Sequence, residues 1–196
     1  MNPLKSVPGT IATGFILAII IMIAMGAGSL NSLSLSVWLH VIAGVVWIGL
    51  LYYFNFVQVP GVGAALADSD GPGPAAINKY VAPRALFWFR WGAVATWVTG
   101  AGALQGLAPG GLQSAFTLAP GFEVIGLGAW LGTIMLFNVW VFIWPNQKKI
   151  LGIVDASAEQ IASGKVIALM ASRINTVLSI PMLMCMVGYG HGGLPY

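Results

Sequence analysis

The sequence predicts an all-α fold, an integral membrane helical bundle of about five transmembrane helices that forms a single domain over residues 1–196. Hydrophobic residues make up 58% of the chain and charged residues only 7%. Soluble proteins contain about 25% charged residues. Five apolar segments also reach the length of about 20 residues that a helix needs to cross a bilayer core of about 30 Å. Both observations predict a membrane protein.

The predicted spans are separated by segments that favour turns and loops. A short turn around Asn31 divides the first two spans, and Gly- and Pro-rich loops, SDGPGPAAINKY and GLAPGGLQSAFTLAPG, follow the second and third. A polar stretch, PNQKKILGIVDASAEQIASGK, precedes the fifth. We find no repeat at a fixed period and no second domain. In chain order, the spans are predicted at residues 10–30, 36–59, 85–107, 122–144 and 166–190.

The basic residues indicate the orientation of these spans. All eight lie at or beside the ends that five alternating spans place on one side: Lys5, Lys79, Arg84, Arg90, Lys148, Lys149, Lys165 and Arg173. Because cytoplasmic loops are enriched in Lys and Arg, the N-terminus is predicted inside and the C-terminus outside. The net charge of +3 is explained by topology, so no nucleic acid partner is expected.

The single cysteine limits the chemistry of the chain. Cys185 lies in an apolar stretch. One cysteine excludes an intrachain disulfide, a Cys-x-x-Cys-His haem attachment and a cysteine-rich zinc site within these residues.

Two histidines are predicted near the outer leaflet. His40 lies near the start of the second span and His191 at the end of the fifth, and these two ends share one side of the membrane. Helical spacing predicts one shared face in the second span, and this face should point into the bundle. Its members are His40, Gly44, Trp47, Leu51, Asn55 and Gln58.

Such a face is suited to a flat cofactor. Neutral imidazole is a good iron ligand, so His40 and His191 are predicted as metal ligands of a haem b held between two helices. Gly44 and Gly188 would leave room for the edge of the macrocycle, and Trp47 is an aromatic side chain available to pack against it. The outer side offers no Lys or Arg for the haem propionates, which leaves Tyr196, backbone groups or water. Alternatively, both histidines are interfacial residues and the glycines are helix contacts.

A second group of polar residues is predicted towards the cytoplasm. Its members are Asn55, Gln58, Arg90, Asn138, Ser172, Arg173 and Asn175, and the four helix segments that carry them are expected to converge. Arginine with amide partners inside a membrane indicates an anion, quinone or proton site. The alternative is that both arginines reach the lipid headgroups. Glu123 enters the fourth span from the outer side, as a proton-handling group or an interfacial residue.

Three blocks of sequence resemble a known family. WLHVIAGVVWIGLLYYFNFVQVP, FNVWVFIWPNQKKI and SRINTVLSIPMLMCMVG are similar to the N-terminal membrane domain of bacterial cytochrome-linked urate oxidases of the urate hydroxylase type, over residues 36–191. The second span also resembles the haem-binding membrane protoporphyrinogen oxidases. The resemblance favours His40 and His191 as haem ligands and implies a multi-pass protein of the bacterial inner (cytoplasmic) membrane. Members of the urate oxidase type carry further spans and a c-type cytochrome domain, which these 196 residues lack.

Two hypotheses follow from these patterns. In the first, the protein is a membrane redox component that binds haem b and passes electrons to an external c-type cytochrome. In the second, it is a non-catalytic accessory subunit that packs within a larger respiratory or photosynthetic membrane complex, or forms a homo-oligomer in the lipid bilayer. No catalytic residue of the family is transferred to this chain, and whether it is an enzyme stays open.

Overall fold

The computed structural model of the protein describes residues 2–26 and 31–194. Helices dominate the described residues, and no strand occurs among them, so the all-α prediction is confirmed. Residues 27–30 of the first predicted span, and Tyr196, lie outside the described residues. The α-helices are α1 (Val7–Ala24), α2 (Ser32–Tyr53), α3 (Val59–Ala67), α4 (Ala82–Leu107), α5 (Gly111–Phe116), α6 (Glu123–Phe137), α7 (Trp144–Ile150) and α8 (Ala158–Gly190).

Four helical segments are long and apolar enough to cross a membrane. They are Val7–Ala24, the continuous segment Ser32–Ala67, the segment Glu123–Ile150 and Ala158–Gly190. Each of the four extends beyond its predicted span at one end or both, because the chain stays helical through residues outside the apolar stretch.

The third predicted span, residues 85–107, also forms a helix but lies outside this apolar group. As α4 it has 26 residues, a length of about 39 Å at the usual rise of an α-helix. Arg84 and Arg90 near its start, and Gly, Thr and Gln residues further along, make it more polar than the other four. Of the five predicted spans, four are therefore confirmed as helices that are long and apolar enough to cross a membrane.

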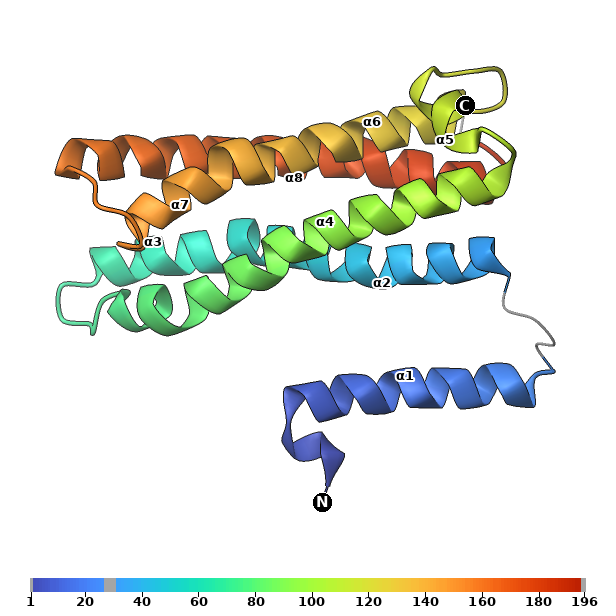
Figure 1. Ribbon diagram of the computed structural model, residues 1–196. Coiled ribbons are helices and arrows are strands. Elements are labelled where there is room, and N and C mark those ends of the chain that lie inside the picture. The colour runs from blue at the N-terminus through green and yellow to red at the C-terminus, as the bar shows by residue number, and fades with distance from the viewer. Residues whose placement is uncertain (1, 27–30, 195–196) are drawn as a thin grey trace.

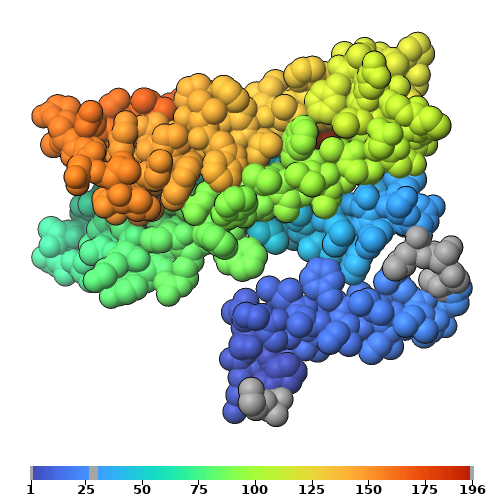
Figure 2. All heavy atoms as spheres, in the orientation of Figure 1, coloured from blue at the N-terminus to red at the C-terminus, as the bar shows by residue number. Residues whose placement is uncertain are grey.

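The long helices form two antiparallel pairs, with a first helix set apart (Figure 1). One pair is α2 with α4, and the other is α6 and α7 with α8. The main core lies between the pairs and includes Trp47, Leu51, Phe89 and Met135. By contrast, α1 has no buried residue and touches α2 through an edge-to-face contact between Phe15 and Trp38. Figure 2 shows the space between α1 and the bundle.

Three turns of these helices are wider than an α-helix. The π-helical segments are Phe54–Gln58, Ile77–Val81 and Asn138–Ile143, and each ends two residues before a proline: Pro60, Pro83 and Pro145. Proline has no N–H to donate and its ring collides with the carbonyl one turn earlier. A widened turn at that point accommodates both defects while the chain stays helical.

Two asparagines in the widened turns connect their helices to α8. Asn138 Nδ2 donates to Asn175 Oδ1 over 2.8 Å, and Asn175 Nδ2 donates to the Met135 carbonyl over 2.9 Å. Asn55 Nδ2 donates to Ser172 Oγ over 2.8 Å. Asn175 is fully buried. These bonds hold the segments Ser32–Ala67 and Glu123–Ile150 against adjacent turns of α8.

Replacing Asn175 with alanine should destabilise the bundle, because the Asn138 amide then loses its buried acceptor. We expect Asn175→Ala to lower the free energy of unfolding by about 1–3 kcal/mol. The measurement is thermal unfolding in detergent followed by circular dichroism. In a double-mutant cycle with Asn138→Ala, the coupling energy should be about 0.6–1.7 kcal/mol. Strict additivity of the two single substitutions would contradict this assignment.

Candidate functional site

His40 is held by a backbone carbonyl of the neighbouring helix. The half-buried imidazole lies in α2, and its Nδ1 is 2.8 Å from the Thr96 carbonyl of α4. Because a carbonyl only accepts hydrogen bonds, Nδ1 carries the proton. In the neutral ring, Nε2 then keeps its lone pair, the arrangement by which proteins orient histidine ligands of metals.

Gly100 makes room for this imidazole. A Cβ atom at Gly100 would lie 2.8 Å from both Cε1 and Nδ1 of His40. The ring is thus pressed against the backbone of α4, where only glycine fits without moving it. At Gly44, by contrast, a Cβ would meet only Thr96 Cγ2, at 3.8 Å, which is an ordinary contact.

His191 follows α8, and the C-terminal end of α8 lies at the same end of the bundle as the start of α2 (Figure 1). His191 is exposed, and its Nδ1 is 3.0 Å from the Val187 carbonyl of the same helix. By the same reasoning, Nδ1 carries the proton and Nε2 is available. The His40 ring is thus hydrogen-bonded to α4 and the His191 ring to its own helix, and the two rings are not hydrogen-bonded to each other.

The other predicted cofactor residues lie in packed surroundings. Trp47 is buried in the main core and its Nε1 has no hydrogen-bond partner. Gly188 is also buried, and a Cβ there would meet Leu194 Cδ2 at 2.9 Å. The space beside Gly188 is therefore filled by the end of the chain itself. Among residues 2–26 and 31–194, no group of three or more His, Cys, Asp or Glu side chains converges on a metal position.

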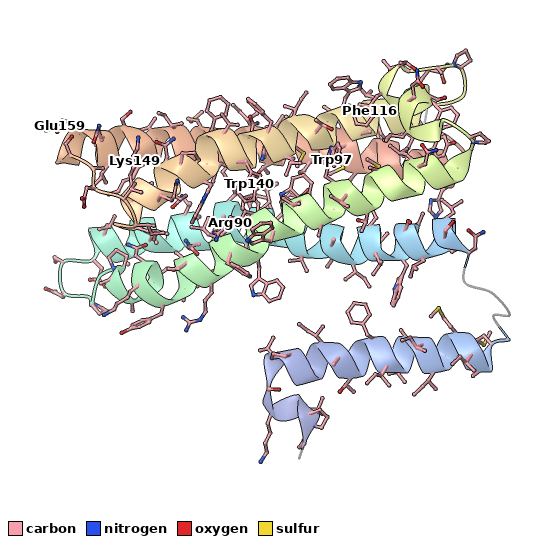
Figure 3. All side chains as sticks on the ribbon, viewed as in Figure 1. Arg90, Trp97, Phe116, Trp140, Lys149 and Glu159 are labelled. Atoms are coloured by element: carbon pink, nitrogen blue, oxygen red, sulfur yellow. The ribbon has the colours of Figure 1, made fainter. Side chains whose placement is uncertain are left out.

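Four of the seven inner polar residues form pairs between helices. Asn55 pairs with Ser172 and Asn138 with Asn175, whereas Arg173 is exposed and neither arginine is hydrogen-bonded to an amide side chain. Arg90 lies with its guanidinium carbon 3.8 Å from the centre of the Trp144 ring. The labelled side chains in Figure 3 show Arg90 near the level of Trp140 in the bundle. Asn55 Oδ1 and Gln58 Oε1 are buried without a partner.

The Glu123 side chain is hydrogen-bonded to the loop that precedes its own helix. Its Oε2 accepts a hydrogen bond from the Gly121 backbone N–H over 2.7 Å, and the side chain is exposed. A carboxylate at the start of α6 is also favoured by the helix dipole.

Sequence reasoning expected Gly100 only as a close helix contact and did not connect it, or Thr96, with His40. Both lie on α4, far from His40 in the sequence. A signal for them exists in the glycine pair Gly100 and Gly102, since glycines in a membrane helix commonly mark close approach of another helix.

Part of the chain matches a known family. Residues 113–194 match the family model described as urate oxidase N-terminal. The resemblance drawn from the sequence is thus confirmed for this part of the chain. No curated protein and no solved structure matches the chain.

Replacing Gly100 with alanine should displace the His40 ring and break its bond to Thr96. In spectra that correlate the imidazole nitrogens with their ring protons, the native protein should show the Nδ1–H tautomer of His40, and Gly100→Ala should lose this signature. Gly44→Ala is the matched control and should keep it, because its new methyl group has room. An unchanged His40 signal in Gly100→Ala would show that the ring does not depend on this close approach.

Proposed function

We propose that the protein is a multi-pass membrane redox component in which His40 would hold haem b through Nε2 and His191 would supply a second nitrogen ligand. The observation that carries the proposal is the hydrogen bond from His40 Nδ1 to the Thr96 carbonyl. It fixes the proton on the nitrogen that faces α4 and leaves the other nitrogen free to bind iron. The match of residues 113–194 to the urate oxidase N-terminal family supports the relation to redox membrane proteins.

The residues at this end suit the proposed group in part. Both histidines direct Nδ1 to a backbone carbonyl, so each keeps Nε2 for a ligand. The filled space at Gly188 means that the C-terminal segment carrying Leu194 has to move before a macrocycle approaches α8 there. When bound, haem b supplies one-electron transfer. The proposed electron partner is a separate c-type cytochrome at the end of the bundle that carries both histidines.

The location follows from the charges and the helix directions. We propose a bacterial inner membrane, with the chain crossing five times, α4 included, the N-terminus inside and the C-terminus outside. α4 runs beside α2 along the bundle, and the basic residues other than Arg173, which lies at the middle of α8, are found towards the ends assigned to the cytoplasm.

A non-catalytic accessory subunit is the second candidate function. The observation that favours it is α1, a helix without a buried residue that is joined to the bundle mainly by the contact of Phe15 with Trp38. A helix with this little packing of its own is available to a respiratory or photosynthetic membrane complex.

Absorption spectra test the redox proposal. Detergent-purified protein, produced with full haem supply, should give a low-spin haem b spectrum in the oxidised and dithionite-reduced states. His40→Ala and His191→Ala should both lose it, and Gly100→Ala should weaken it while Gly44→Ala does not. If His40→Ala loses the haem b spectrum and His191→Ala keeps it, His191 is not a haem ligand. A featureless spectrum of the unaltered protein would reject the proposal in favour of the accessory subunit.

Cysteine labelling tests the proposed topology. In a Cys185→Ala background, Ser69→Cys and Gln113→Cys introduce exposed thiols into the loop after α3 and into the short helix α5, at opposite ends of the bundle. A thiol reagent that does not cross membranes should label Gln113→Cys in intact cells and Ser69→Cys only after the membrane is opened. Labelling of both positions in intact cells would contradict five crossings.

A further inference from the structure

Arg90 lies at the depth where the inner lipid headgroups are expected. The helix α1 has 18 residues, a length of about 27 Å, which is close to the bilayer core of about 30 Å. Its first residue, Val7, therefore marks the inner face of the core in the proposed topology. Figures 1 and 3 show Arg90 near the level at which α1 begins, whereas α3, α7 and the first turns of α8 extend beyond that level. Trp88 and Trp91, beside Arg90 on α4, are exposed, as in the tryptophan belt of a membrane interface.

The charge of the half-buried Arg90 is not balanced by a nearby acidic residue. Its guanidinium carbon lies 3.8 Å from the centre of the Trp144 ring and 5.5 Å from that of the Phe87 ring. Stacking uses the flat face of the group and leaves its N–H donors pointing outwards in the plane. A charge at this depth is costly without a counter-ion. An anion from outside the chain would therefore be favoured at Arg90.

The helices around Arg90 are basic as well. All five acidic residues of the chain lie elsewhere, in the loop after α3, at the start of α6 and around the start of α8: Asp68, Asp70, Glu123, Asp155 and Glu159. Residues 77–107 and 138–150 contain no acidic residue and five basic ones: Lys79, Arg84, Arg90, Lys148 and Lys149. This side of the bundle is therefore complementary to a negative headgroup.

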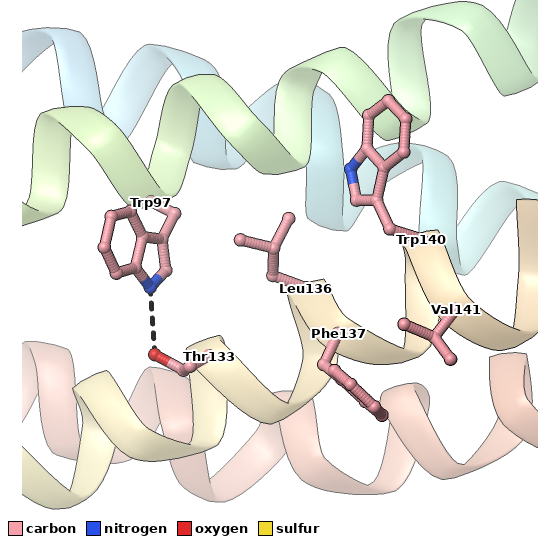
Figure 4. A pocket seen from close by; sticks show the side chains of 6 residues that line it. All are labelled: Trp97, Thr133, Leu136, Phe137, Trp140 and Val141. Atoms are coloured by element: carbon pink, nitrogen blue, oxygen red, sulfur yellow. Dashed lines mark hydrogen bonds between the residues drawn. The ribbon is translucent and has the colours of Figure 1, made fainter.

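An apolar groove adjoins this charge on the face shared by α4 and α6. Its volume is about 380 Å³, and it is lined by Trp97, Thr133, Leu136, Phe137, Trp140 and Val141. Across it, Trp97 Nε1 donates to Thr133 Oγ1 over 2.9 Å, so these two polar groups satisfy each other, as Figure 4 shows. The Trp140 ring packs edge to face on Trp91, the neighbour of Arg90, and Trp144 follows Trp140 by one helical turn. The groove therefore runs outwards from the level of Arg90.

Trp140, between the charge and the groove, carries an unpaired donor. Its Nε1 is buried and has no hydrogen-bond partner. Figure 4 shows this nitrogen on the side of the ring that faces Leu136 and Trp97. An unpaired N–H in hydrocarbon is costly, and an acyl chain has no acceptor to offer it. An acceptor that enters beside the ring would satisfy this donor. In a glycerophospholipid, ester carbonyls lie between the phosphate and the acyl chains.

We propose that an anionic phospholipid of the inner leaflet binds in a site formed by α4, α6 and α7. Its phosphate lies against the edge of the Arg90 guanidinium, an ester carbonyl accepts from Trp140 Nε1, and one acyl chain fills the groove. Hydrocarbon alone matches only the groove, whereas this ligand matches all three features in their order along the bundle. A zwitterionic headgroup fits less well, because its cation meets the basic residues of α4 and α7. The proposal rests on the proposed topology and is independent of haem.

Lipid retention in native mass spectrometry tests this site. Protein purified in detergent is mixed with phosphatidylglycerol, or with phosphatidylcholine that carries the same acyl chains. The unaltered chain should retain phosphatidylglycerol several-fold more than phosphatidylcholine. Arg90→Gln should lower the retention of phosphatidylglycerol several-fold, because it removes the charge from the site. Arg84→Gln is the matched control and should keep the retention, since Arg84 is exposed and donates to the Tyr80 carbonyl of its own helix.

Glycerol phosphate, which has the phosphate without the acyl chains, tests the part played by the groove. It should bind far more weakly than phosphatidylglycerol. Equal retention of the two lipids, or equal loss in Arg90→Gln and Arg84→Gln, would overturn the proposal. Binding of glycerol phosphate as tight as that of the lipid would also overturn it, and would make the site one for free phosphate. Because the comparison of ligands uses the unaltered chain, it decides the proposal whether or not the variants fold. The haem spectrum enters none of these measurements, so failure here is distinct from failure of the redox proposal.

Discussion

The amide bonds on α8 are the constraint on which the arrangement of the bundle depends. In a membrane, apolar surfaces gain nothing from leaving lipid for another apolar surface, so specific polar bonds and close packing fix how helices fit. Asn175, fully buried, accepts from Asn138 and donates to the Met135 carbonyl, and Asn55 reaches Ser172 on the adjacent turn. The segments Ser32–Ala67 and Glu123–Ile150 are thereby held in register against the same helix, α8.

The widened turns make these bonds possible. Asn55 and Asn138 each lie in a π-helical segment that compensates for a proline two residues beyond the segment's end. With α2 and α6 fixed, α4 packs closely on α2, and a Cβ at Gly92 would lie 3.4–3.6 Å from Val46 and Trp47. The same close approach, continued to Gly100, orients the His40 imidazole towards the Thr96 carbonyl. The position of His40 therefore depends on the amide bonds of Asn55 and Asn138, because these bonds fix the helices against which α4 packs.

Several features were predictable because they depend on local composition. The helices, their order and the inward face of α2 follow from apolar length and helical spacing, and the convergence of Asn55, Asn138, Ser172 and Asn175 follows from their common depth. The π-helical turns were not predicted, although the prolines that cause them are visible in the sequence. Residues 47–55 (WIGLLYYFN) and 130–138 (WLGTIMLFN) share Trp, Gly, Phe and Asn at the same spacing. This likeness was also missed, because it does not recur at a fixed period along the chain.

The sequence by itself determined that the chain is all-helical with apolar segments long enough to cross a membrane, and it pointed to the histidines, since apolar length and residue type are properties of single segments. Only the tertiary structure decided which nitrogen of His40 is protonated, because that depends on the Thr96 carbonyl of another helix. It also decided that Gly100 makes room for the ring whereas the space beside Gly188 is filled by Leu194. Finally, it decided that Trp47 is buried and Trp130 is exposed, although each opens a Trp-x-Gly stretch of a long helix. Burial depends on how whole helices pack, and a local pattern does not encode which neighbour a helix face will meet.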